Sequence, residues 1–210
     1  MIDIPRRMRV LPLDKHGRPV PWFVAWVDGQ PDHRVVAPGK LRDALRFGCC
    51  WLCGETLGAW KAFVIGPMCA VNRVSAEPPS HRDCATYAAR ACPFLTTPGM
   101  VRRPNRLPDG TVPPAGIAIP RNPGVALVWV TRTFEAFSPA GGGVLFGLGG
   151  PQEALWFAQG RAATRAEVLA SIESGLPILR VEAEAESSEA ARELETQAAA
   201  ALALLPGEPA

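Results

Sequence analysis

The sequence predicts an α+β fold, because strand-like and helix-like patterns occur in both halves of its 210 residues. Continuous apolar runs with β-branched and aromatic residues lie at 22–27 and 124–134 and predict strands. Apolar residues at helical spacing occupy 38–47, and a capping signature opens a helix at Thr164. With 48% hydrophobic and 20% charged residues, the composition is that of a chain that buries a core.

The N-terminal region is expected to contain a hairpin and a short helix. Strand 22–27 is followed by a turn at Asp28-Gly29, and 33–36 is expected to return beside it. Residues 38–47 then form the helix, with a proline in its first turn.

Two residue pairs in the cysteine-rich segment have the spacing of a metal site. Cys50 and Cys53 are two residues apart and precede a glycine, so one sharp turn can direct both sulfurs at a single ion. His81 and Cys84 are expected in the first turn of a helix capped by Ser80, three residues apart on one face. Three sulfurs and one imidazole predict one tetrahedral zinc ion per chain. Four protein ligands leave no position for water, so the ion is expected to be structural.

The other three cysteines provide alternatives to this ligand set. Cys49 can replace Cys50 in a longer spacing, and Cys69 can replace His81. Cys92 is expected below the metal on the same helix face. Since the sequence has no visible export signal, its thiols are expected to stay reduced, in the cytoplasm.

The segment from 50 to 92 resembles the treble-clef zinc finger. Residues 62–65 and 68–74 are two strand-like runs around Gly66-Pro67, so the expected order is knuckle, hairpin and helix. The resemblance implies a zinc scaffold that serves many unrelated functions. In HNH-type nucleases it also implies a catalytic histidine in the hairpin, where this chain has Asn72 and Arg73.

A second resemblance covers 62–73 and 78–84. This stretch looks like part of a group of uncharacterised bacterial or phage-encoded proteins. That resemblance implies no particular activity.

The remainder of the chain is expected to form a connector, a hairpin with helices, and a tail. Eight prolines at 93–123 predict an extended connector without helix. Glycines at 141–143 are expected to turn strand 124–134 back into 144–146, before helices at 151–159 and from Thr164 to Gly175-Pro177. The chain is expected to divide into four units: 1–92 with the zinc segment, the connector 93–123, the hairpin and helices of 124–180, and an acidic helical tail at 181–210.

Charge is unevenly distributed along the chain. The net charge is +2, but 181–210 holds seven acids and one arginine, which leaves +8 for 1–180. A basic body can attract nucleic acid, and the weakly packed tail expected here can compete with it. The arginines expected to contact phosphates are Arg73, Arg82, Arg90, Arg102 and Arg103, with Arg106 beside them. Trp51 and Trp60 are expected to stack on bases.

These observations favour a non-enzymatic, zinc-stabilised binding protein, with nucleic acid as a candidate ligand. The alternative is a protein–protein adaptor or inhibitor, and the third interpretation is an HNH-like nuclease relative without a recognisable catalytic histidine. No membrane contact is expected, since no apolar run approaches the ~20 residues needed to cross a bilayer. No nucleotide cofactor is expected, because the glycines at 147–150 lack the spacing of a phosphate-binding loop.

Overall fold

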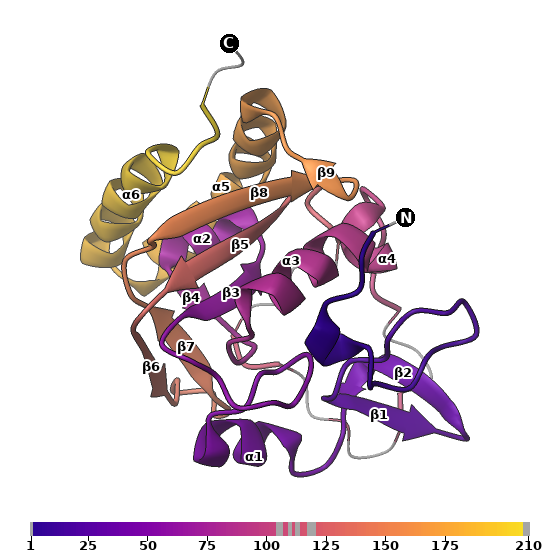
Figure 1. Ribbon diagram of the computed structural model, residues 1–210. Coiled ribbons are helices and arrows are strands. Elements are labelled where there is room, and N and C mark those ends of the chain that lie inside the picture. The colour runs from indigo at the N-terminus through magenta and orange to yellow at the C-terminus, as the bar shows by residue number, and fades with distance from the viewer. Residues whose placement is uncertain (1, 104–106, 109–110, 112–113, 117–120, 208–210) are drawn as a thin grey trace.

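The computed structural model describes residues 2–103, 107–108, 111, 114–116 and 121–207, and it has the predicted α+β character (Figure 1). A 3₁₀ turn at Arg6–Met8 precedes the regular elements. The helices are α1 (Lys40–Phe47), α2 (Pro67–Asn72), α3 (Arg82–Ala91), α4 (Pro93–Thr96), α5 (Arg165–Glu186) and α6 (Ser188–Leu202). The strands are β1 (Val24–Val27), β2 (Gln30–Val36), β3 (Lys61–Ile65), β4 (Val74–Ser75), β5 (Ala126–Thr131), β6 (Phe134–Phe137), β7 (Leu145–Leu148), β8 (Glu153–Ala158) and β9 (Arg161–Ala162).

The main sheet is antiparallel, in the order β3-β5-β8-β9, and has helices on both faces (Figure 1). All six residues of β5 are buried, which explains the continuous apolar run in its sequence. On one face, Val128 and Val130 contact α3. On the other face, Leu127 and Trp129 join the core formed with α2, α5 and α6. The sheet therefore separates α3 from α2.

Strand β3 belongs to the first expected unit, 1–92, yet it pairs with β5 from 124–180. Phe63 lies opposite Trp129 in this ladder. The two units thus share one sheet and one core.

The hairpin predicted at 62–74 is wrong. Gly66 is extended and Pro67 occupies the first turn of α2, a position for which its fixed φ is suited. Met68 and Val71 of α2 are buried in the main core. The apolar residues of this segment therefore belong to a helix that packs on the sheet, and not to a second strand.

The predicted pairing of 124–134 with 144–146 is also wrong, although the glycine turn is present. Strand β7 pairs with β6 and β4 instead. The hydroxyl of Thr131 accepts a hydrogen bond from the backbone N–H of Thr133, so the chain bends immediately after β5. Phe134 then begins the strand that β7 joins.

Two further helix predictions need correction. Residues 153–158 of the predicted helix form β8, whose pairing with β5 decides their conformation. In the connector, Pro93 starts the short helix α4, so the expectation of no helix at 93–123 fails for its first four residues.

Helix α5 starts as predicted and ends later than predicted. Thr164 and Glu167 form both hydrogen bonds of a capping box. The helix continues through Gly175 and Pro177 to Glu186. A Cβ at Gly175 would lie 2.6 Å from the sulfur of Met68, so this glycine permits close packing of α5 on α2 and does not end the helix.

The expectation of a weakly packed tail is wrong for the described part of 181–210. Leu194, Ala198 and Ala201 of α6 are buried in the main core. The indole N–H of Trp156 donates to the carbonyl of Leu204 at 2.8 Å. Ala198 and Ala201 on the inner face let α6 pack directly on α2.

The N-terminal hairpin of β1 and β2 and the helix α1 form near their predicted positions. Within the described ranges, no helix is long and apolar enough to span a bilayer.

Leu194→Ala should lower the free energy of unfolding by about 2–5 kcal/mol, because it removes a buried side chain from the core. Leu202→Ala is the matched control: the same substitution on the same helix at a side chain that is 44% exposed. It should change stability by no more than about 0.5 kcal/mol. Urea unfolding measures both, and equal effects would contradict the packing of α6.

Candidate metal centre

The turn that carries Cys50 and Cys53 is held by its own backbone. The N–H of Cys50 donates to the carbonyl of Glu55 at 2.7 Å, and the N–H of Gly54 donates to the carbonyl of Cys50 at 2.9 Å. Gly54 has φ +80°, and a Cβ there would lie 2.6 Å from the indole of Trp22. The glycine after the second cysteine is therefore required both by its conformation and by its close approach to a side chain.

The second pair of candidate ligands lies where α3 begins, but not with the predicted cap. Ser80 pairs with Ala62 of β3 through two backbone hydrogen bonds and does not cap the helix. His81 is the N-cap residue, with extended backbone, and Cys84 lies in the first turn. The positive end of the helix dipole favours a thiolate at this position.

Cys50, Cys53, His81 and Cys84 converge on one point. Their candidate ligand atoms all lie within 4.8 Å of one another, and Cys53 Sγ is 3.4 Å from His81 Nδ1. The three sulfur-bearing residues are buried. This cluster could hold a metal ion, as predicted. Cys49, Cys69 and Cys92 are not part of the cluster.

Hydrogen bonds around the cluster orient its ligands. The Nε2 of His81 lies 3.1 Å from the carbonyl of Thr56, an acceptor, so Nε2 carries the proton. Nδ1 faces Cys53 and is the ring nitrogen placed to bind an ion. The backbone N–H groups of Cys53 and His81 point at Cys50 Sγ, at 3.5 and 3.3 Å. Such a contact pattern suits a thiolate more than a thiol.

The three thiols influence one another strongly. Hydrogen bonds from the Cys53 and Cys84 side chains lower the pKa of Cys50, with help from the two backbone N–H groups. The hydrogen bond to Cys50 raises the pKa of Cys53 to about 11, and the pKa of Cys84 is raised as well. One thiolate therefore forms readily, while further thiolates require a cation to offset their repulsion.

An apolar shell and one arginine enclose the cluster. Met8, Leu52 and Tyr87 are buried against the cysteines. Arg7 pairs with Glu55 at 3.3 Å and with Asp83 at 3.2 Å, so it links the cysteine turn to α3. The N-terminal turn at Arg6–Met8 thus covers a site formed by distant segments, a role that the sequence did not indicate.

The predicted phosphate-contacting arginines come from different elements of the fold. Arg82 pairs with Glu153 at 2.6 Å, and Arg90 donates to the carbonyl of Gly160 at 3.2 Å; both lie on α3. Arg73 is the C-cap residue of α2, and α2 packs on the face of the sheet opposite to α3. Arg106 lies outside the described residues.

The other two predicted arginines belong to the connector. The guanidinium of Arg102 lies over Phe94, with 4.9 Å to the ring centroid. The carbonyl of Arg103 accepts a hydrogen bond from Arg34.

The two tryptophans expected to stack on bases differ in exposure. Trp51 is 3% exposed and stacks on Phe23 with 4.7 Å between ring centroids, so its predicted contact with bases is wrong. Trp60 is 42% exposed. The guanidinium of Arg132 lies 4.5 Å from the centroid of a Trp60 ring.

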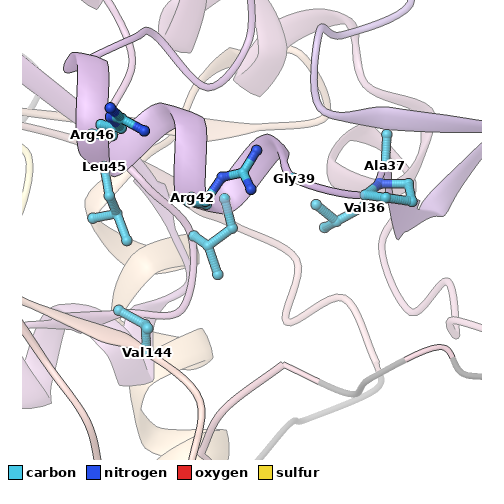
Figure 2. A pocket seen from close by; sticks show the side chains of 9 residues that line it. Val36, Ala37, Gly39, Arg42, Leu45, Arg46 and Val144 are labelled. Atoms are coloured by element: carbon cyan, nitrogen blue, oxygen red, sulfur yellow. The ribbon is translucent and has the colours of Figure 1, made fainter.

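A shallow hollow of about 760 Å³ lies beside α1 (Figure 2). Leu41 and Leu45 of α1, Val36 and Val144 form its apolar wall, and Arg42 and Arg46 lie at its rim. Figure 2 shows Leu45 extending from the helix toward Val144. The hollow contains no member of the metal cluster.

Gly54→Ala should destabilise the protein by more than the roughly 1–3 kcal/mol expected for a side chain in left-handed backbone, since its Cβ also meets Trp22. Gly48→Ala is the control, because Gly48 has φ +61° and nothing within 4 Å of the added Cβ. Thermal unfolding of both variants separates the two contributions. Equal losses would show that the contact with Trp22 does not matter.

Comparison of the chain with protein-family models, curated proteins and solved structures finds no match. The resemblance to bacterial or phage-encoded proteins stays a prediction.

Proposed function

We propose that Cys50, Cys53, His81 and Cys84 hold one zinc ion, and that the chain is a non-enzymatic binding protein stabilised by this ion. The observation that carries the proposal is the convergence of the four ligand atoms within 4.8 Å. Three sulfurs and one nitrogen match the tetrahedral coordination preferred by zinc in structural sites.

A structural role follows from the closed ligand set. Four protein ligands fill the tetrahedron, so no position is left for a catalytic water. His81 faces Cys53 with Nδ1 and the Thr56 carbonyl with Nε2, so neither ring nitrogen is available as a general base. The contacts of His81 therefore give the HNH-like nuclease interpretation the least support of the three.

Two classes of ligand remain, and different surfaces favour them. The exposed Trp60 beneath Arg132 favours nucleic acid, because an aromatic ring and a guanidinium suit a base and a phosphate. The hollow beside α1 favours a protein partner, since Leu45 is 41% and Val36 is 45% exposed there. Nucleic acid is the leading candidate, and the adaptor role is the alternative.

Purified protein should contain close to one zinc ion per chain by elemental analysis. Cys84→Ser should lose the ion and lower the melting temperature, because metal binding and folding are coupled. Cys92→Ser is the control, since Cys92 lies at the end of the same helix but outside the cluster. It should retain full zinc content. Metal-free wild-type protein with unchanged stability, or zinc retained by Cys84→Ser, would refute the zinc site.

A further inference from the structure

An aromatic and cationic patch formed by Trp60, Arg132 and Arg82 lies directly beside the metal cluster. Arg82 follows the candidate ligand His81 in the chain, and Trp60 precedes β3. All three side chains are exposed to solvent. The tryptophan of this patch is therefore accessible, whereas Trp51 is buried. Arg82 is the member of the patch that the sequence also predicted to contact phosphates.

Strand pairing brings the three residues together. Lys61 lies opposite Thr131 at the end of the β3–β5 ladder, so Trp60 and Arg132 are the next residues beyond it on the two neighbouring strands. The guanidinium of Arg132 lies over the indole of Trp60. Ala62 exchanges two backbone hydrogen bonds with Ser80, so the antiparallel path places Trp60 and Arg82 at the same end of this pairing.

The charges of the patch are available to an anion. Arg82 contacts Glu153, which lies opposite Val130 on β5, but the side chains of this pair are 51% and 42% exposed. An exposed pair of this kind contributes little, so a phosphate can replace the carboxylate. The neighbouring acids Glu55 and Asp83 are both paired with Arg7. A guanidinium stacked on an indole also keeps its N–H edge free for a phosphate oxygen.

We propose that this patch binds single-stranded nucleic acid, with an unpaired base stacked on Trp60 and its flanking phosphates contacted by Arg132 and Arg82. The inference rests on the proposed binding role and specifies its ligand. A single strand fits better than a duplex because an indole needs an accessible base face, which base pairing and stacking hide in a duplex. Binding should show little sequence preference, since every base offers such a face.

The test is fluorescence anisotropy of the full-length, zinc-loaded protein with a labelled 20-nucleotide poly-dT strand and a labelled duplex, at several salt concentrations from about 50 mM upward. Trp60→Ala should weaken binding to the single strand by about 5- to 100-fold. Trp26→Ala is the matched control, because Trp26 is 50% exposed on β1, away from the patch. It should bind as the wild type does.

The paired variant Arg82→Ala with Arg132→Ala tests the phosphate contacts. The slope of log affinity against log salt should become shallower by about 1.4, at about 0.7 per phosphate on a single strand. Arg192→Ala on α6 is the charge control and should leave the slope unchanged. Zinc content and melting temperature verify that each variant folds. If Trp60→Ala does not fold, the salt slope of the double arginine variant still tests whether the patch binds the strand.

The outcomes separate this inference from the proposed function. Wild-type binding that is unaffected by Trp60→Ala and by the arginine pair would overturn this patch and leave nucleic-acid binding in place. A preference for duplex would overturn the single-strand assignment. No binding to either probe at the lowest salt would remove nucleic acid as the ligand and leave the protein partner, while the zinc proposal stands on its own measurement.

Discussion

Three thiols and one imidazole converge within 4.8 Å of one another in this protein, and burying them together has a cost in repulsion and desolvation that must be offset. The cluster joins the cysteine turn to the first turn of α3, and apolar residues such as Met8 and Tyr87 pack around it. A bound cation would neutralise the thiolates and cross-link the cysteine turn to α3.

Helix α3 transmits this constraint to the rest of the molecule. Its first turn belongs to the cluster through Cys84, and its inner face rests on the main sheet through Ala85 and Ala89. These small side chains allow the helix axis to lie close to β3 and β5. The position of Arg82, and with it the patch around Trp60, is consequently determined both by the metal cluster and by the sheet.

The sequence could predict features whose cause is local. The ligands were identified because C-x-x-C and H-x-x-C place paired donors within one turn, and the capping box at Thr164 has the same short range. The partner of β3 could not be identified from the sequence. Strand β5 lies about 60 residues further along the chain, and only the energy of strand pairing selects it from the possible partner strands.

Other errors arose where tertiary packing overrode a local signal. Gly175 resembles a helix end, yet its missing Cβ serves contact with Met68. The apolar residues of β8 fit a helix as well as a strand, and their ladder with β5 determined the outcome. The patch around Trp60 was only partly predicted, because Arg132 reaches it through strand register and not through proximity in the sequence.

X-ray absorption spectroscopy at the zinc edge of the purified full-length protein tests the central claim most directly, because it reports the ligand atoms around the metal. Three sulfur neighbours at about 2.3 Å and one nitrogen neighbour at about 2.0 Å are expected. Oxygen neighbours in place of sulfur, or a coordination shell without a histidine signature, would contradict the site formed by Cys50, Cys53, His81 and Cys84.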